Sequence, residues 1–271
     1  MKIKLPGSST CFLLDDKTDS KLFETQFCSV FYPYAIKILF STQFEYYDVL
    51  IKIKKDQLEL IRRDGVVFFI RVDSFFTTYK SIFTIIQDNI CLQENYCYLH
   101  GSAIVIDGEA YLFLAKTGTG KSTLSVFLDH EGYTCLSDDI IILNTMDWSI
   151  IPISKYAHIR ENSLPLLNKV QNKLKFNENI LRYEYLLSDK RFATSYRIKR
   201  IFIIDRTGRN FTIYSTEESC MGILENMFLP YQIKQNILSA FQICESIEVK
   251  CLEYGDLQSF KQCMSCLTNA S

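Results

Sequence analysis

The segment Ala115-Lys-Thr-Gly-Thr-Gly-Lys-Ser122 decides the fold of this 271-residue chain. It nearly repeats the phosphate-loop pattern G-x-x-x-x-G-K-[ST], with alanine in place of the first glycine. In such a loop, successive backbone N–H groups point into one concavity at a helix N-terminus and bind phosphate oxygens. The first glycine supplies freedom and no ligand, so we expect Ala115 to tune the loop and not to abolish it. The predicted nucleotide-binding residues are Lys116, Thr117, Gly118, Thr119, Gly120, Lys121, Ser122 and Thr123.

The sequence around this segment supplies the structural context that a phosphate loop needs. Apolar runs at Ser102–Ile106 and Ala110–Leu114 flank Asp107-Gly108, which predicts a hairpin whose second strand ends at the loop. After the loop, apolar residues at helical spacing predict a helix that ends near Gly132. A chance match in an unrelated turn would need strand, loop and helix to coincide by accident. We therefore favour a nucleotide site.

Two adjacent carboxylates follow between short apolar strands at 133–136 and 140–143. Alone, Asp138 and Asp139 would be interpreted as turn or cap residues. Beside a phosphate loop, one can act as base for a hydroxyl nucleophile and the other can bind metal, because Mg²⁺ prefers oxygen ligands. We assign Asp138 as the general base and Asp139, with the Ser122 hydroxyl, to the metal; the reverse division stays open. Lys121 can reach the β- and γ-phosphates, so ATP and Mg²⁺ are the expected cofactors.

Further candidates lie on both sides of this region. The hairpin folds His100 back toward the loop, so a site role and a structural role are about equally expected from the residues alone. Arg160 follows the acidic pair and could bind transferred phosphate or a substrate carboxylate, although a surface arginine is the commoner outcome. His158 is a weaker candidate than Arg160.

Composition excludes several classes of protein. With 48% hydrophobic and 23% charged residues the chain is expected to fold, and 30 basic against 31 acidic residues leave no electrostatic footprint for nucleic acid or a membrane surface. No apolar run approaches the roughly 20 residues of a membrane span. The N-terminal residues MKIKLPGSSTCFLLDD lack an uninterrupted apolar core, so no signal peptide and a cytoplasmic location are expected. A homo-oligomer stays open, and the ten cysteines are expected to pack as small apolar residues, with Cys263 and Cys266 a weak metal or redox alternative.

The pattern along the chain predicts an α/β protein in two parts. Residues 1–95 form a β-rich N-terminal region, with a hairpin around Asp64-Gly65 and a connecting helix from Ser74 to about Gln93. Residues 96–271 form the catalytic domain. Its second half contains a polar stretch at 161–195, predicted as a helix or a surface excursion. The remaining predicted elements are a strand at 198–205, helices at 216–228 and 232–244, a strand at 247–251, and a last helix to Leu267 capped by Asp256.

The segments LHGSAIVIDGEAYLFLAKTGTGKSTL (99–124) and GYTCLSDDIIIL (132–143) resemble the catalytic domain of HPr kinase/phosphorylase and its shorter relatives. The resemblance implies a fold similar to phosphoenolpyruvate carboxykinase nucleotide domains, and Mg²⁺-dependent phosphate transfer to a serine hydroxyl. It implies a catalytic role for His100 and Lys121, and matches Asp138 to the proposed base. The glycine-rich second signature of full HPr kinases is not found. The chain therefore looks more like compact relatives encoded with peptide-modification systems, including lasso-peptide precursor kinases.

Three functions follow as expectations. The first is ATP- and Mg²⁺-dependent phosphorylation of a serine in a peptide or protein. The second is a small-molecule kinase, for example one acting on free serine, with the same site and a closed acceptor pocket. The third is a nucleotide-sensing regulatory protein without catalysis, in which the basic stretch at 161–200 would contact a partner.

Overall fold

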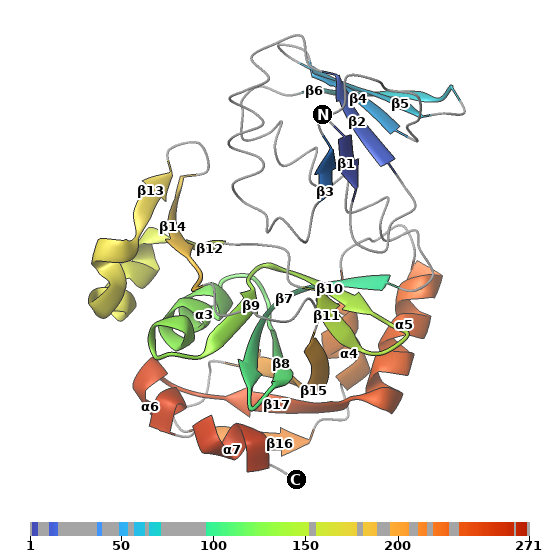
Figure 1. The fold of residues 1–271 in the computed structure, drawn as a ribbon. Coiled ribbons are helices and arrows are strands. Elements are labelled where there is room, and N and C mark those ends of the chain that lie inside the picture. The colour runs from blue at the N-terminus through green and yellow to red at the C-terminus, as the bar shows by residue number, and fades with distance from the viewer. Residues whose placement is uncertain are drawn as a thin grey trace. The chain divides into compact units, whose positions relative to one another are not determined.

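The computed structural model describes residues 2–4, 11–15, 37–39, 49–53, 57–62, 65–71, 96–151, 156–177, 181–188, 196–205, 211–215, 219–227, 233–262 and 264–269. The chain divides into two compact units, Met1–Glu94 and Asn95–Ser271 (Figure 1). None of the described helices is both long enough and apolar enough to cross a membrane.

The first unit contains a six-stranded sheet in the order β3-β1-β2-β4-β5-β6. Its strands are β1 (Lys2–Lys4), β2 (Cys11–Asp15), β3 (Lys37–Leu39), β4 (Val49–Ile53), β5 (Gln57–Arg62) and β6 (Val67–Arg71). The predicted hairpin is confirmed: β5 and β6 pair antiparallel with Leu58 opposite Ile70, and Gly65 takes a φ of 85°. The predicted helix from Ser74 lies outside the described residues.

The second unit is built on an eight-stranded sheet in the order β11-β10-β7-β8-β15-β17-β16, with β9 also paired to β7. Its strands are β7 (Tyr96–Ile106), β8 (Glu109–Leu114), β9 (Thr134–Ser137), β10 (Ile140–Asn144), β11 (Ser149–Ile151), β15 (Tyr196–Asp205), β16 (Thr212–Ser215) and β17 (Glu248–Glu253). β15 runs parallel to β8 and β17, while β7 and β8 form the predicted hairpin. Asp107 and Gly108 turn this hairpin with φ angles of 52° and 83°.

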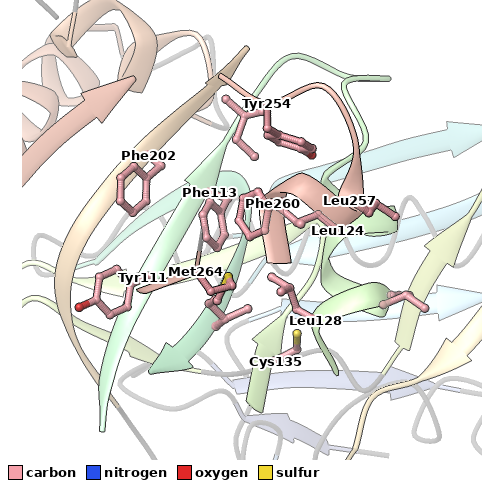
Figure 2. Close-up of a cluster of buried hydrophobic side chains, with 14 of the residues drawn as sticks. Tyr111, Phe113, Leu124, Leu128, Cys135, Phe202, Tyr254, Leu257, Phe260 and Met264 are labelled. Atoms are coloured by element: carbon pink, nitrogen blue, oxygen red, sulfur yellow. The ribbon is translucent and has the colours of Figure 1, made fainter. Parts of the chain in front are cut away.

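Strand β8, which leads directly into the loop, is buried on both faces. Tyr111, Phe113 and Ala115 belong to one apolar cluster, and the alternate residues Leu112 and Leu114 belong to a second. Figure 2 shows the first cluster, in which Phe113 lies between strand β15 and the C-terminal helices. Apolar residues on both faces of a strand are typical of the centre of an α/β sheet.

The helices cover the two faces of this sheet. They are α3 (Lys121–His130), α4 (Ser219–Leu224), α5 (Ile233–Ser246), α6 (Leu257–Gln262) and α7 (Met264–Asn269). The first cluster takes residues from α3, α6 and α7, and the second from α4 and α5. The α/β fold predicted from the sequence is therefore confirmed. Within the predicted helix at 216–228, the described residues are helical over α4 and form a turn at 225–226, and the predicted last helix corresponds to α6 and α7. Asp256 caps α6 as predicted, accepting N–H bonds from Gln258 and Ser259 at 2.8 Å each.

A second, three-stranded sheet lies beside α3. Its order is β12-β14-β13, with β12 (Tyr156–Ile159), β13 (Lys175–Asn177) and β14 (Arg182–Leu186), and a 3-10 helix, η1 (Glu161–Lys173), connects β12 to β13. The prediction of a helix or surface excursion at 161–195 thus covered η1 but missed both strands. Buried Asp129 of α3 holds this sheet, accepting bonds from the Tyr185 hydroxyl at 3.0 Å and the Ser188 hydroxyl at 2.7 Å.

Candidate active site

The phosphate loop leaves the end of β8 and becomes the first turn of α3. Gly118 and Gly120 have φ angles of 92° and 106°, in a region that residues with a Cβ rarely adopt. Ala115 is buried in the first apolar cluster and its backbone is not left-handed. A glycine is therefore required at the two positions where the sequence keeps one, and not at the position where it has alanine. The expectation that Ala115 is tolerated agrees with this geometry.

Lys121 lies buried inside the loop. Its ammonium group donates to the carbonyl oxygen of Ala115 and lies 3.4 Å from that of Lys116. Burial lowers the pKa of Lys121, while the nearby carboxylates of Asp138 and Asp139 act in the opposite direction. The side chain is thus held at the centre of the concavity by carbonyl oxygens, which phosphate oxygens could replace.

The acidic pair forms a tight turn between β9 and β10. The N–H of Ile140 donates to the carbonyl of Asp138 at 2.9 Å, and the Ser137 hydroxyl donates to the carbonyl of Ile140 at 2.6 Å. Asp139 has a φ of 72°, a conformation that aspartate tolerates better than most residues. The turn sends the two side chains in different directions, as expected for adjacent residues. Asp138 points toward α3, and Asp139 points toward β7.

Asp138 is 1% exposed and contacts the helix that follows the loop. The Ser125 hydroxyl shares its hydrogen between Oδ1 of Asp138, 3.2 Å away, and the carbonyl of Lys121. Oδ2 of Asp138 is buried and accepts no hydrogen bond from the described residues. Burial and the charge of Asp139 raise the pKa of Asp138 to about 6, against smaller lowering effects that include hydrogen bonding by Ser122. A carboxyl with a pKa in this range can exchange protons near neutral pH.

Asp139 is the more accessible carboxylate, with 56% of its side chain exposed. Nδ1 of His100 lies 3.0 Å from its carbonyl oxygen and 3.1 Å from Oδ1. Since both oxygens are acceptors, Nδ1 carries the hydrogen. Burial tends to raise the pKa of Asp139, but the hydrogen bond and charge of His100, with His158 and Lys121, lower it overall. Asp139 is therefore ionised at neutral pH, and His100 lies beside it.

Strand β12 brings two further groups to the loop. A guanidinium nitrogen of Arg160 lies 3.8 Å from the position that a Cβ on Gly118 would occupy. His158, two residues earlier, is close enough for its positive charge to act on both aspartates, and its Nε2 lies 3.8 Å from Oε1 of Glu184. The structure therefore brings Arg160 beside the loop, and with it His158, the weaker candidate of the sequence analysis.

The remaining predicted residues line the loop itself. The Thr119 hydroxyl donates to the carbonyl of Lys116 at 2.7 Å and closes a turn, Thr117 is exposed, and Thr123 is buried. Sequence reasoning missed Ser125 and Glu184. Ser125 could have been found, because it lies three residues after Ser122 and hence on the same face of the helix. Glu184 lies in a polar stretch without a motif, so only the pairing of β12 with β14 reveals it.

The residues present fit a nucleoside triphosphate with a magnesium ion. The loop supplies a glycine cradle and a buried ammonium group, and Oδ2 of Asp138 is an unused buried acceptor next to it. Among the described residues, no group of three or more His, Cys, Asp or Glu side chains is arranged to hold a metal alone. Mg²⁺ usually keeps waters and phosphate oxygens in its coordination shell and needs only one or two protein ligands, which Ser122 and Asp139 could provide.

Comparison with curated proteins supports the resemblance stated from the sequence. The chain is 26% identical over 92 residues to the HPr kinase/phosphorylase of Chlorobium phaeovibrioides, a match covering 34% of this chain and 27% of that protein. Over these 92 residues the chain is similar to HPr kinase/phosphorylase. The match spans only about a quarter of the length of that curated relative. No protein-family model matches the chain.

Among solved structures, the chain is similar to the HPr(Ser) kinase/phosphatase from Coxiella burnetii. The sequence identity is 13%, the TM-score is 0.32, and the similarity covers 64% of this chain and 95% of the other.

Proposed function

We propose that residues 96–271 form an ATP- and Mg²⁺-dependent kinase that transfers the γ-phosphate to a serine hydroxyl of a peptide or protein. One observation carries this proposal: a buried carboxyl, Asp138, whose pKa is raised to about 6, contacts the first turns of the phosphate-loop helix. A proton acceptor at the phosphate loop is what hydroxyl phosphorylation needs and what a purely nucleotide-binding protein does not. The name of the curated relative supports the same reaction class.

Each residue of the site has a role in this reaction. Backbone amides of the loop and Lys121 bind the phosphates and neutralise their charge. Bound Mg²⁺ would screen the phosphate oxygens and orient the γ-phosphate, and Ser122 and Asp139 would hold it. Asp138 accepts the proton of the acceptor hydroxyl. His100 fixes the orientation of Asp139 and stabilises its negative charge. Positioning and electrostatics of this kind supply most of the rate in phosphoryl transfer.

If the general-base and metal-binding roles of the two aspartates are exchanged, a different result is expected. In that case the buried Asp138, which contacts Ser122, would serve the metal, and the exposed Asp139 with His100 would take the proton. We therefore propose to measure Mg²⁺ dependence for Asp138→Asn and Asp139→Asn. If Asp138 is the base, its variant keeps the Mg²⁺ concentration needed for nucleotide binding, and the Asp139 variant requires more. The opposite result would reverse the assignment.

The acceptor can be identified by incubation with [γ-³²P]ATP, Mg²⁺ and the peptides encoded beside the gene, because the resemblance points to ribosomally made peptide precursors. Label on a peptide serine supports the proposal. Label on a metabolite would indicate a small-molecule kinase, and nucleotide binding without transfer to any acceptor would indicate a regulatory protein. Lys121→Ala, which removes the loop ammonium group, is the control for contaminating kinase activity.

A further inference from the structure

Strand β12 presents one face to the phosphate loop and the other to the core. Ala157 and Ile159 are buried in the apolar cluster that contains α3. Because side chains alternate along an extended strand, Tyr156, His158 and Arg160 lie on the opposite face. Arg160 continues this alternation, since its φ and ψ of −80° and 152° are extended. The loop side of β12 is therefore a polar row.

The guanidinium group of Arg160 has no hydrogen bond or ion pair with any described residue. One of its nitrogens lies 3.8 Å from the position that a Cβ on Gly118 would occupy, beside the loop. A guanidinium is charged at all relevant pH values and forms paired hydrogen bonds with carboxylates and phosphates. Its position beside the loop and the absence of a partner among the described residues both favour an anionic ligand.

His158 lies on the same face of β12, two residues before Arg160. Its ring is anchored from β14 by Glu184, at 3.8 Å between Nε2 and Oε1. Glu184 is itself fixed by the Asn177 amide, which donates to Oε1 at 2.6 Å. Glu184 thus contacts both His158 and Asn177, and no ion pair joins it to Arg160 among the described residues.

The other cationic and hydrogen-bonding groups of the site already have a role on the donor side. Lys121 and the loop amides face the position of the nucleotide phosphates, and His100 is bonded to Asp139. We propose that Arg160 and His158 form an acceptor subsite for a carboxylate adjacent to the hydroxyl that receives the phosphate. The carboxylate belongs either to a chain end or to an acidic neighbour of the serine. This inference rests on the proposed kinase function and specifies its substrate class.

The test compares charged and neutral acceptors of equal size. N-acetyl-L-serine and N-acetyl-L-serinamide test a chain-end carboxylate, and acetyl-Ser-Asp-amide and acetyl-Ser-Asn-amide test a side-chain carboxylate. Binding is measured by NMR titration with a non-hydrolysable ATP analogue and Mg²⁺, and transfer is measured separately by ADP release. We expect one charged acceptor to bind at least about 10-fold more tightly than its neutral partner, since a charge-assisted bond is typically worth this much.

Three variants and one control show which residues cause the preference for a charged acceptor. The measured quantity is the ratio of the affinity for a charged acceptor to the affinity for its neutral partner. Arg160→Gln should remove most of this charged-over-neutral ratio, and His158→Gln should reduce it several-fold. Glu184→Gln should weaken the ratio by releasing His158, while nucleotide affinity stays unchanged. Lys173→Gln, an equal charge change at an exposed position of η1, should leave the ratio intact. A ratio is informative because partial unfolding would lower binding of both acceptors equally.

The outcomes separate this inference from the kinase proposal. Equal binding of charged and neutral acceptors, or no binding of any of the four, would overturn the carboxylate subsite. The same holds if the ratio survives in both Arg160→Gln and His158→Gln. A charged-over-neutral preference that depends on Arg160, without transfer to any acceptor, would support the subsite and contradict the kinase proposal.

Discussion

The phosphate loop and the β12-β14-β13 sheet adjoin the same site but are held in place by different kinds of contact. The loop is shaped by its own residues: two left-handed glycines, and bonds from Thr119 and Lys121 to nearby carbonyls. The small sheet depends on contacts between distant parts of the chain, above all those of Asp129 with Tyr185 and Ser188. Substitutions in the loop should therefore damage nucleotide binding, whereas substitutions in the small sheet should change acceptor binding and leave the nucleotide site intact.

Asp138→Asn, beside the phosphate-loop helix, should have the largest effect on activity. Loss of a general base is expected to lower kcat by roughly 10²–10⁴-fold. The amide is nearly isosteric, so ATP affinity should change little. Single-turnover transfer and equilibrium binding of ATP measure the two quantities. Transfer within a few-fold of wild type would show that Asp138 is not the base.

Lys121→Ala tests the donor side alone. Removing a buried ammonium group that faces the phosphates should lower kcat by roughly 10²–10³-fold and weaken ATP binding. The matched control is Lys116→Ala, which keeps the backbone N–H expected to bind phosphate and removes only a side chain that is 79% exposed and lies 3.5 Å from Glu225. Such an exposed pair contributes little, so this variant should remain within a few-fold of wild type. Equal losses in the two variants would contradict a specific role for Lys121.

Asp138→Asn should also stabilise the folded protein at neutral pH. The folded-state pKa of about 6 exceeds the ordinary value of 3.8, so the folded protein binds this proton more tightly than the unfolded chain. The stability associated with the protonated carboxyl is complete below pH 3.8 and is lost as the pH rises through about 6. The difference corresponds to at most roughly 3 kcal/mol.

This stability prediction is measured by urea unfolding without nucleotide or metal. The free energy of unfolding of the Asn variant should exceed that of wild type at pH 7.5 and approach it near pH 4. Ser137→Ala serves as a control, because it removes a neighbouring hydroxyl without removing a titrating group, and it should show no such change with pH. A variant no more stable than wild type at pH 7.5 would contradict the raised pKa of Asp138.

Substitution of the loop glycines should have a smaller effect, set by backbone strain. Alanine at Gly118 or Gly120 must adopt a φ near 92° or 106°, at a cost of roughly 1–3 kcal/mol. The loop can avoid this cost only by changing shape, so ATP affinity should fall about 5- to 100-fold. Ala115→Gly is the reciprocal control and should keep wild-type ATP affinity. Isothermal calorimetry measures each affinity, and unchanged binding by both alanine variants would show that the cradle does not need these φ angles.

The same contrast explains how much could be predicted from the sequence. The hairpin, the loop, α3 and the acidic turn follow from short patterns, because turn glycines, apolar alternation and helical spacing act within a few residues. His100 could be placed because a hairpin returns the chain to its starting edge, where Ile140 pairs with it. The small sheet could not be predicted, since β12 and β14 pair across the polar stretch that contains η1. Glu184 and the approach of Arg160 to Gly118 depend on that pairing.

The pKa of Asp138 likewise could not be obtained from the sequence. A pair of adjacent aspartates is equally compatible with two exposed turn residues. Their unequal environments arise because the left-handed conformation of Asp139 turns one side chain toward α3 and leaves the other beside His100. Burial of a carboxyl against Ser125 is a tertiary effect that no local pattern encodes.

Tyr185→Phe should have the smallest effect and is the most selective test of the contrast between the two regions. It removes one hydroxyl donor to buried Asp129 and keeps the aromatic packing, while Ser188 still donates to the carboxylate through its N–H at 3.1 Å and its hydroxyl. The expected loss is about 1 kcal/mol of unfolding free energy. Loosening the small sheet relative to α3 should raise KM for the acceptor about two- to five-fold at unchanged kcat and unchanged ATP affinity. Tyr183→Phe, on the same strand and without a hydrogen bond to Asp129, is the control. If ATP affinity falls as much as acceptor affinity, the small sheet also supports the loop, and the proposed independence of the two regions is wrong.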